Sequence, residues 1–314
     1  MDTLGGLLDA PRARGAFALR TVMSSPWSLR ILAESPITLI AGVSGDTWVV
    51  PDEGEPVWLG PGDIAVTRAP DHYNVADSPT TAPTVIIHPG QQCCDLEGNS
   101  VLEQWTHGTR TWGNDTDGST VFLVGAYEHL SDISDRLLSA LPPVLSISHD
   151  DWASPLIPLL RDEVVKDEPG QAAVLDRLLD LLLTAVLKAW FAQHDTSRPE
   201  WWRYQGDRII ERALRVMHDN PAHPWTLDKL ASEAGASRAS LARRFHELVG
   251  EPPMTFLKHW RMALAADLLC QPDETLSTVA EKIGYSTPFA FSAAFKRVRG
   301  LSPQEHRASA LSTA

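Results

Sequence analysis

The sequence predicts an α+β chain of several domains, with an N-terminal β-barrel or sandwich, a helical segment and an all-α C-terminal domain. Three observations lead to this fold class. The length of 314 residues suggests two domains or slightly more. Residues 1–146 consist of short β-prone runs separated by turns, and residues 226–300 contain one helical unit twice.

The N-terminal part contains seven short β-prone runs. These are Trp27–Leu32, Ile37–Val43, Thr47–Val50, Pro56–Leu59, Ile64–Thr67, Thr84–His88 and Thr120–Val124. Turn signals such as Gly45-Asp46 and Gly60-Pro61-Gly62-Asp63 separate them. Closely spaced short strands of this kind favour a small barrel or sandwich.

Leucine recurs at helical spacing between residues 151 and 195, and Pro169-Gly170 divides this segment into two helices. The apolar stripe is wide enough to cover the barrel and also to meet a partner chain. Two interpretations stay open. The segment is either an intrachain helical hairpin or a homodimer interface along Leu175–Leu187, with Leu179 and Leu183 in the contact. His194–Trp202 is the best candidate for a linker.

The C-terminal part is built on an internal repeat. Ala231, Gly235 and Ser237 recur 49 positions later as Ala280, Gly284 and Ser286. Further along, the shift becomes 50, and it relates Leu241, Phe245, Gly250 and Pro253 to Phe291, Phe295, Gly300 and Pro303. The second copy therefore carries one extra residue in its turn or helix start.

Each copy predicts a helix, a tight turn at glycine and a second helix. Thr226 and Ser237 cap the two helices of the first copy, and Ser286 or Thr287 caps the second helix of the other. Met254–Gln271 contains neither Gly nor Pro and predicts one long connecting helix. A short Gly-containing turn between two small helices is typical of the helix-turn-helix unit, whose second helix enters a major groove of DNA.

The run LASEAGASRASLARRFHELVGEPPMTFLKHWRMALAADLLCQPDETLSTVAEKIGYSTPFAFSAAFKRVRGLSPQEHR resembles the DNA-binding domain of AraC/XylS-type transcription regulators. The match covers roughly a third of the chain, residues 203–307. It includes the repeat, Arg261 in the connecting helix, the Ala-Glu-Lys-Ile-Gly-Tyr turn and the closing Gly-Leu-Ser-Pro. The resemblance implies a sequence-specific DNA-binding transcription regulator.

A second resemblance concerns the N-terminal part. The turn from Leu59 to Ile64 resembles the Pro-Gly-Asp turn of cupin barrels. Gly125-x-Tyr127, Leu137-Leu138-x3-Leu141-Pro142 and Trp152 look like the cupin-type sensor half found in one branch of AraC-like regulators. The two resemblances together imply a cupin-like β-barrel as sensor domain at 1–148, a helical dimerisation segment and linker at 149–202, and an all-α double helix-turn-helix domain at 203–309.

The resemblance also implies which residues meet DNA. They are Ser237, Arg238, Ala239, Ala242 and Arg243 in the first copy, and Thr287, Phe289, Ser292 and Lys296 in the second. In the resembled family an Arg on each recognition helix commonly reaches a base edge. The first copy keeps it as Arg243, whereas the second has Ala293 at the matching place. We therefore expect sequence specificity to be concentrated in the first copy.

The net charge of −13 is unevenly distributed. From residue 203 onward there are 15 basic and 12 acidic residues, whereas the preceding part has 12 basic and 28 acidic residues. The acidic part should repel phosphate, so DNA contact is expected at the C-terminal end alone. The expected partners are double-stranded DNA, a small-molecule effector, a second copy of the chain, and RNA polymerase if the protein is an activator.

No signal peptide is visible, and the apolar run Leu178–Phe191 is too short and too polar to span a bilayer. We therefore expect a cytoplasmic protein without a membrane partner. His72, His88, His107 and His129 are scattered, with no His-x-His pair of the kind that metal-dependent cupins need. We therefore expect a protein that is not an enzyme and that holds neither a metal nor a cofactor. The alternative, from another class of function, is a catalytic cupin with a DNA-binding tail.

Cys93-Cys94 offers an alternative mode of sensing. Exposed thiolates near positive groups are oxidised selectively, so the pair could be a redox switch. The other interpretation is two small, partly buried hydrophobes, and Asp95 and Glu97 should raise a thiol pKa. The tryptophans of this region suit either core packing or an apolar ligand pocket: Trp48, Trp58, Trp105 and Trp112. The sequence does not assign the effector-binding residues.

Overall fold

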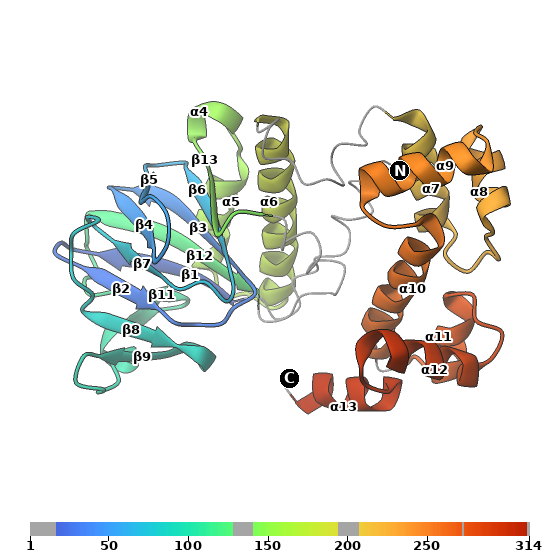
Figure 1. Ribbon diagram of the computed structural model, residues 1–314. Helices are drawn as coiled ribbons and strands as arrows, with labels where there is room; N and C mark the ends of the chain where they lie inside the picture. Colours follow the sequence, from blue (N-terminus) through green and yellow to red (C-terminus); the bar gives the residue numbers. More distant parts are fainter. Residues whose placement is uncertain (1–16, 128–140, 194–206, 272, 313–314) are drawn as a thin grey trace. The chain divides into compact units, whose positions relative to one another are not determined.

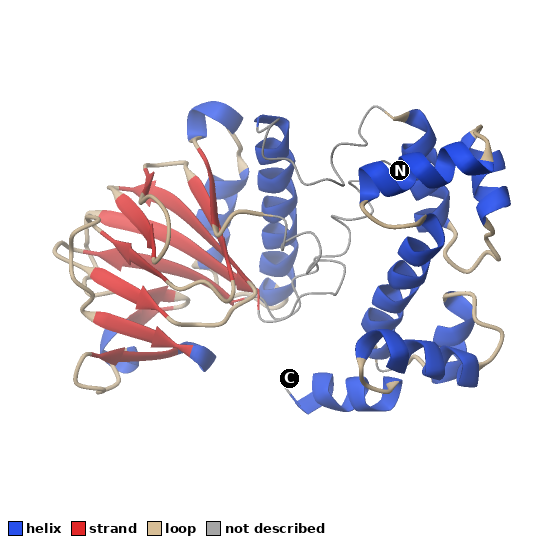
Figure 2. Ribbon diagram, viewed as in Figure 1, coloured by secondary structure: helices blue, strands red, loops and turns tan. Residues whose placement is uncertain are grey.

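The computed structural model describes residues 17–127, 141–193, 207–271 and 273–312. These fall into two compact units, a sheet-rich unit that ends at residue 193 and a helical unit that begins at residue 207. The predicted linker at 194–202, together with His129, Leu137 and Leu138, lies outside the described residues. The predicted α+β fold class is confirmed (Figures 1 and 2).

The first unit is a sandwich of two sheets, one of the two architectures predicted. The seven-stranded sheet has the order β10 (Thr106–Gly108), β11 (Thr111–Trp112), β1 (Phe17–Met23), β12 (Thr120–Tyr127), β3 (Ile37–Ser44), β6 (Ile64–Arg68), β13 (Val144–Ile147). The six-stranded sheet has the order β5 (Val57–Leu59), β4 (Thr47–Pro51), β7 (Tyr73–Ala76), β2 (Ser28–Ile31), β8 (Val85–His88), β9 (Gln92–Asp95). Each of the seven predicted runs overlaps one of these strands, and β3, β4, β6 and β12 extend one to three residues beyond the predicted end.

The turn that joins β5 to β6 is tied to the end of the sandwich by Asp63. Its buried carboxylate accepts the Gly60 amide at 2.8 Å and the His149 amide at 2.7 Å. Gly62 adopts φ +89°, and a Cβ there would lie 2.7 Å from the His149 ring. The Pro-Gly-Asp turn thereby anchors the start of α4 (His149–Trp152) to the sheet.

Two helices, α5 (Leu156–Val164) and α6 (Gln171–Gln193), cover the outer face of the seven-stranded sheet (Figure 1). Gly170, with φ +85°, lies in the break between them, as predicted. The closest approach is at Gly125 in β12, where a Cβ would lie 2.4 Å from Leu179 Cδ2. The glycine of the Gly125-x-Tyr127 motif therefore lets α6 approach the sheet backbone.

The predicted dimer contact through Leu179 and Leu183 is wrong. Both side chains are buried within their own chain, as are their apolar neighbours Leu175, Leu182, Val186 and Leu187. Leucines recur at helical spacing in α6 because this face of the helix packs on the sheet. Periodicity shows that a helix face is covered, but it does not show what covers it.

The second unit consists of seven helices among the described residues. They are α7 (Arg208–Asp219), α8 (Leu227–Ala234), α9 (Arg238–Val249), α10 (Pro253–Leu269), α11 (Leu276–Lys282), α12 (Pro288–Arg299) and α13 (Pro303–Ser312). The repeat consists of α8–α9 and α11–α12, with α10 between them (Figure 2). The extra residue of the second copy lies in its turn, since Thr287 and not Ser286 caps α12. Helix α7 was not predicted.

Candidate nucleic-acid interface and internal cavity

The two second helices of the repeat, α9 and α12, are built alike. Each starts at a hydroxyl cap, Ser237 accepting from the Ser240 amide and Thr287 from the Ala290 amide. Each buries two apolar residues one turn apart, Leu241 with Phe245 and Phe291 with Phe295. The opposite face of each helix is open to solvent, which is the geometry that a groove-entering helix needs.

In the first copy this face presents exposed Ala239 and Arg243 and half-buried Ala242 at helical spacing. The Arg243 side chain is 64% exposed, and its Nη1 donates to both carboxylate oxygens of Glu247 at 3.0 Å. Arg238 lies 3.4 Å from Asp228 and is also exposed. A guanidinium held by one exposed carboxylate is oriented at little cost and remains available to a base edge.

In the second copy the matching positions carry different chemistry. Phe289 is 85% exposed, Ser292 is half-buried, and Ala293 and Lys296 are exposed. An aromatic ring so open to water has no packing role within the chain, and it can meet a thymine methyl group. Ser292 and Lys296 offer one hydroxyl and one ammonium group. The predicted DNA contacts of both copies stay predictions.

One residue of α10 joins the two halves of this unit, and sequence analysis noted only its place in the resembled motif. Arg261 donates from Nε to the Pro221 carbonyl at 2.7 Å and from Nη2 to the His223 carbonyl at 2.8 Å. Between them, the Ala222 carbonyl faces Gly284, where a Cβ would lie 2.4 Å away. The loop before the first copy is thereby held against the turn of the second. These contacts fix the two recognition helices relative to each other.

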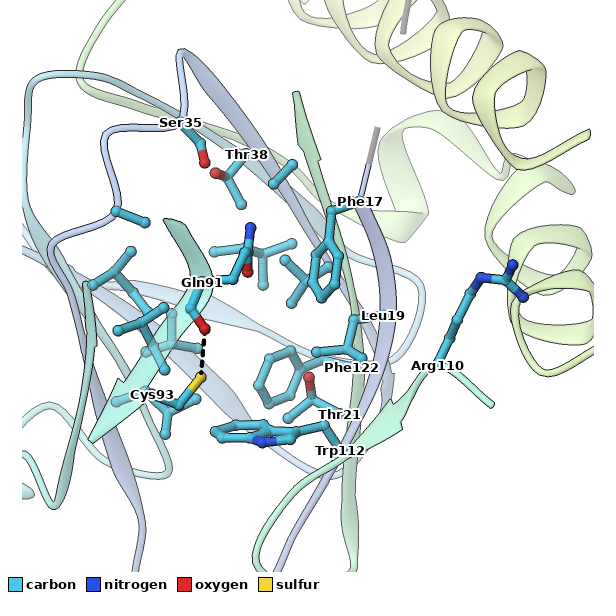
Figure 3. Close-up of a pocket in the computed structure, with 18 of the residues that line it drawn as sticks. Phe17, Leu19, Thr21, Ser35, Thr38, Gln91, Cys93, Arg110, Trp112 and Phe122 are labelled. Atoms are coloured by element: carbon cyan, nitrogen blue, oxygen red, sulfur yellow. Dashed lines mark hydrogen bonds between the residues drawn. The ribbon is translucent and has the colours of Figure 1, made fainter. Parts of the chain in front are cut away.

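The sandwich of the first unit holds a partly open cavity of about 400 Å³ between its sheets (Figure 3). Leu19, Phe122 and Val124 line it from the seven-stranded sheet, and Leu29 and Ile87 line it from the other. Of the four tryptophans considered above, Trp112 lines the cavity, with Trp105 packed on it at 4.8 Å between ring centroids. Trp58 lies outside, and its indole donates to Asp46 at 3.1 Å.

The two adjacent cysteines face different environments. Cys93 is buried, lines the cavity, and donates to the Gln91 carbonyl at 3.5 Å; Cys94 is half-buried. Burial, with a smaller contribution from Cys94, raises the pKa of the Cys93 thiol to about 11. The raised pKa of the Cys93 thiol is therefore caused mainly by burial, and not by Asp95 and Glu97 as the sequence analysis expected. Such a thiol carries little thiolate at neutral pH, so the geometry does not favour the redox alternative.

The histidines of the first unit that the structure describes do not converge on one site. His107 Nε2 lies 2.8 Å from the Gly113 carbonyl, which uses one ring nitrogen in a backbone contact. Within the described ranges, no three His, Cys, Asp or Glu side chains are grouped so that they could hold a metal ion. The same part of the chain contains no helix long and apolar enough to cross a membrane.

Comparison with known proteins agrees with both units. Residues 2–192 match the cupin family model, and residues 230–309 match a helix-turn-helix domain model. A putative AraC-like transcription regulator of Streptomyces lividans is 28% identical over 98% of each chain. The HTH-type transcriptional regulator AlkR of Acinetobacter baylyi is 25% identical over 98% of this chain and 99% of its own. MtrA of Neisseria gonorrhoeae, also an HTH-type transcriptional regulator, is 26% identical over 98% of each. The chain belongs to the AraC family of DNA-binding transcription regulators that carry an N-terminal cupin domain.

Proposed function

We propose that this regulator changes its activity at promoters when a small-molecule effector occupies the cavity of its cupin domain. The observation that carries the proposal is the cavity of about 400 Å³ between the two sheets. Its size is that of a small-molecule site, and most of its lining is apolar. A chain that joins such a cavity to two helix-turn-helix units has the parts of a ligand-responsive regulator.

The test begins with genome-wide mapping of the bound DNA, which supplies a target promoter for a reporter. Genes next to that promoter guide the choice of inducing compounds. The variant Val124→Trp fills the cavity from β12, and the matched control Val165→Trp places the same ring on the exposed end of α5. We expect Val124→Trp to bind promoter DNA but to lose the response. A full response in a folded Val124→Trp protein would contradict the proposal.

We further propose that the first helix-turn-helix copy reads bases and the second mainly contacts the DNA backbone. Arg243 supports this division, since a guanidinium that binds guanine at two atoms discriminates strongly between bases. Ala293 offers no such group at the matching place in α12. The relatives are named as regulators, which supports a cupin domain without catalytic activity. We place the protein in the cytoplasm, with the DNA that it regulates.

The protein is proposed to be a homodimer joined by the outer face of α6. Leu181 is 52% exposed there, and Val174 is 44% exposed. With Leu178 and Ala185 they form a stripe at alternating spacings of four and three residues, the pattern by which two helices pack side by side. One self-complementary stripe on each chain fits a two-fold dimer.

This dimer is tested with Leu181→Glu, which places a charge in the proposed contact without touching the buried stripe. We expect a dimer in the unchanged protein and a folded monomer in the variant, measured by sedimentation at micromolar concentration. The control is Arg177→Glu, also exposed on α6 but outside the stripe. A monomeric unchanged protein, or a Leu181→Glu dimer as strong as the original, would rule out this interface.

A further inference from the structure

The described residues that line the cavity carry almost no charge. Of the described residues that line it, Arg110 is the one with a charged side chain. Its guanidinium is directed away from the cavity (Figure 3), and its Nη1 donates to the Lys166 carbonyl at 3.0 Å. An ion inside would lose its hydration without gaining a counter-charge, which is strongly unfavourable.

The walls of the cavity are hydrocarbon for most of their length. Phe17, Leu19 and Phe122 point into it from the seven-stranded sheet, and Trp112 closes one end (Figure 3). These residues alternate along β1 and β12 with those that face outward, so the inward apolar surface follows from the pleat of the strands. A surface of this kind binds hydrocarbon by removing it from water.

The opposite end of the cavity is polar but neutral. The hydroxyl groups of Ser35 and Thr38 and the amide of Gln91 lie there (Figure 3). Thr38 contacts the Tyr73 hydroxyl. Within the described part of the chain, the side chains of Ser35 and Gln91 have no hydrogen-bond partner. These two side chains are half-buried and neutral, and each can donate to and accept from a polar group of a ligand.

We infer that the cavity binds an uncharged, largely hydrocarbon molecule with one neutral polar group, which meets Ser35 and Gln91 while the hydrocarbon part extends towards Trp112. This inference rests on the proposed function, because it names the chemical class of the effector. The described lining disfavours a carboxylate or an ammonium ion on the same hydrocarbon, because none of its side chains offers an inward-facing counter-charge.

The test compares three probes that share a ten-carbon chain: 1-decanol, decanoate and decyltrimethylammonium. Each is titrated at pH 8 into the full-length protein, and binding is followed by calorimetry and by tryptophan fluorescence. We expect 1-decanol to bind about 100-fold more tightly than either ion, because only the ions bring an unpaired charge into the cavity. Equal or tighter binding of decanoate would overturn the inference.

Gln91→Lys sharpens the test, because it places an ammonium group at the polar end. We expect this variant to bind decanoate at least about tenfold more tightly than the unchanged protein does. The matched control is Gln92→Lys, one residue further on, which is exposed and outside the lining. It should keep the original preference. A Gln91→Lys protein that still rejects decanoate would contradict the position assigned to the polar group.

The outcome is separable from that of the proposed function. If no probe binds but Val124→Trp still abolishes the promoter response, the cavity is the effector site and the ligand class is wrong. If 1-decanol binds as expected but Val124→Trp leaves the response intact, the ligand class stands and the proposed function fails.

Discussion

The two helix-turn-helix copies share a scaffold and differ wherever they face outward. Residues 241–250 and 291–300 have the same order of buried, half-buried and exposed positions. Both recognition helices end at a glycine with positive φ, Gly250 and Gly300. Their exposed residues and their turns are different, however. The shared positions are those required by packing, so the differing ones indicate how the copies divide the work on DNA.

The largest expected difference concerns the turn glycines. Gly235 and Gly284 have similar positive φ values of 70° and 79°, so a change to alanine costs each about 1–2 kcal/mol of backbone strain. At Gly284 alone of the two, the added Cβ would also clash with a backbone atom, the Ala222 carbonyl oxygen at 2.4 Å. We expect Gly284→Ala to lower the free energy of unfolding by more than about 3 kcal/mol, and Gly235→Ala by about 1 kcal/mol.

Thermal and denaturant unfolding of the two variants measure this difference directly. Gly235→Ala is the control for φ alone, because a Cβ there would meet nothing within 4 Å. Equal losses in the two variants would mean that the 220–224 loop moves freely away from the second turn. The fixed relation between the two recognition helices would then also be wrong.

Local signals explain why so much of this unit could be predicted from the sequence. The caps Thr226, Ser237 and Thr287 and the turn glycines act within a few residues of themselves, and the repeat shows each of them twice. Local signals also explain the seven runs predicted in the sheet-rich unit, because each consists of β-prone residues between turn signals. Six strands lie outside the predicted runs: β1, β7, β9, β10, β11 and β13. The two-residue strand β11, for example, is defined by its pairing with distant β1 and not by its own composition.

The cavity could not be predicted, because its lining comes from distant parts of the chain. Thr21, Gln91 and Trp112 meet only when the two sheets pack together. The same limit explains the error at Leu179. Its periodic position correctly predicted a buried residue, but the covering surface, β12 at Gly125, lies 54 residues earlier in the chain.

The two units should also differ in their response to acid. In the second, helical unit, His218 of α7 packs on Trp260 with ring centroids 4.2 Å apart, and its Nε2 is buried without a hydrogen-bond partner in the described chain. Burial, opposed weakly by Asp219, lowers the pKa of His218 to about 4. The unfolded chain has the ordinary pKa of about 6.5 and binds more protons between these values. Stability should therefore fall as the pH drops below about 6.5, and this loss should end near pH 4.

We expect His218 to remove about 2 kcal/mol of stability between pH 7 and pH 5, on an order-of-magnitude estimate. Between pH 7 and pH 5, the His218→Leu variant should lose about 2 kcal/mol less stability than the unchanged protein does. Unfolding curves at the two pH values measure the difference. Nuclear magnetic resonance titration of the His218 ring reports its pKa separately, and a value near 6.5 would contradict the assignment.

A smaller effect is expected from the exposed recognition residues. Arg243→Ala should reduce discrimination by about 1–3 kcal/mol at one or two base pairs, because a bidentate contact to guanine is lost. Ala293→Arg should introduce a new preference in the other half-site by the same chemistry. The measurement is the affinity for every single-base variant of the bound site. If the unchanged protein is equally sensitive in both halves, the proposed division between the copies is wrong.

The smallest effect is expected at Lys296, whose counterpart in the first copy is His246. A lysine carries a full positive charge at neutral pH, so a contact with phosphate releases about one counterion. Lys296→Ala should weaken binding to all sequences alike and lower the slope of log affinity against log salt by about 1. His246→Ala, the matched change in the first copy, removes no formal positive charge and should leave that slope nearly unchanged. If Lys296→Ala instead lost affinity at particular base pairs with an unchanged salt slope, the second copy would be reading bases after all.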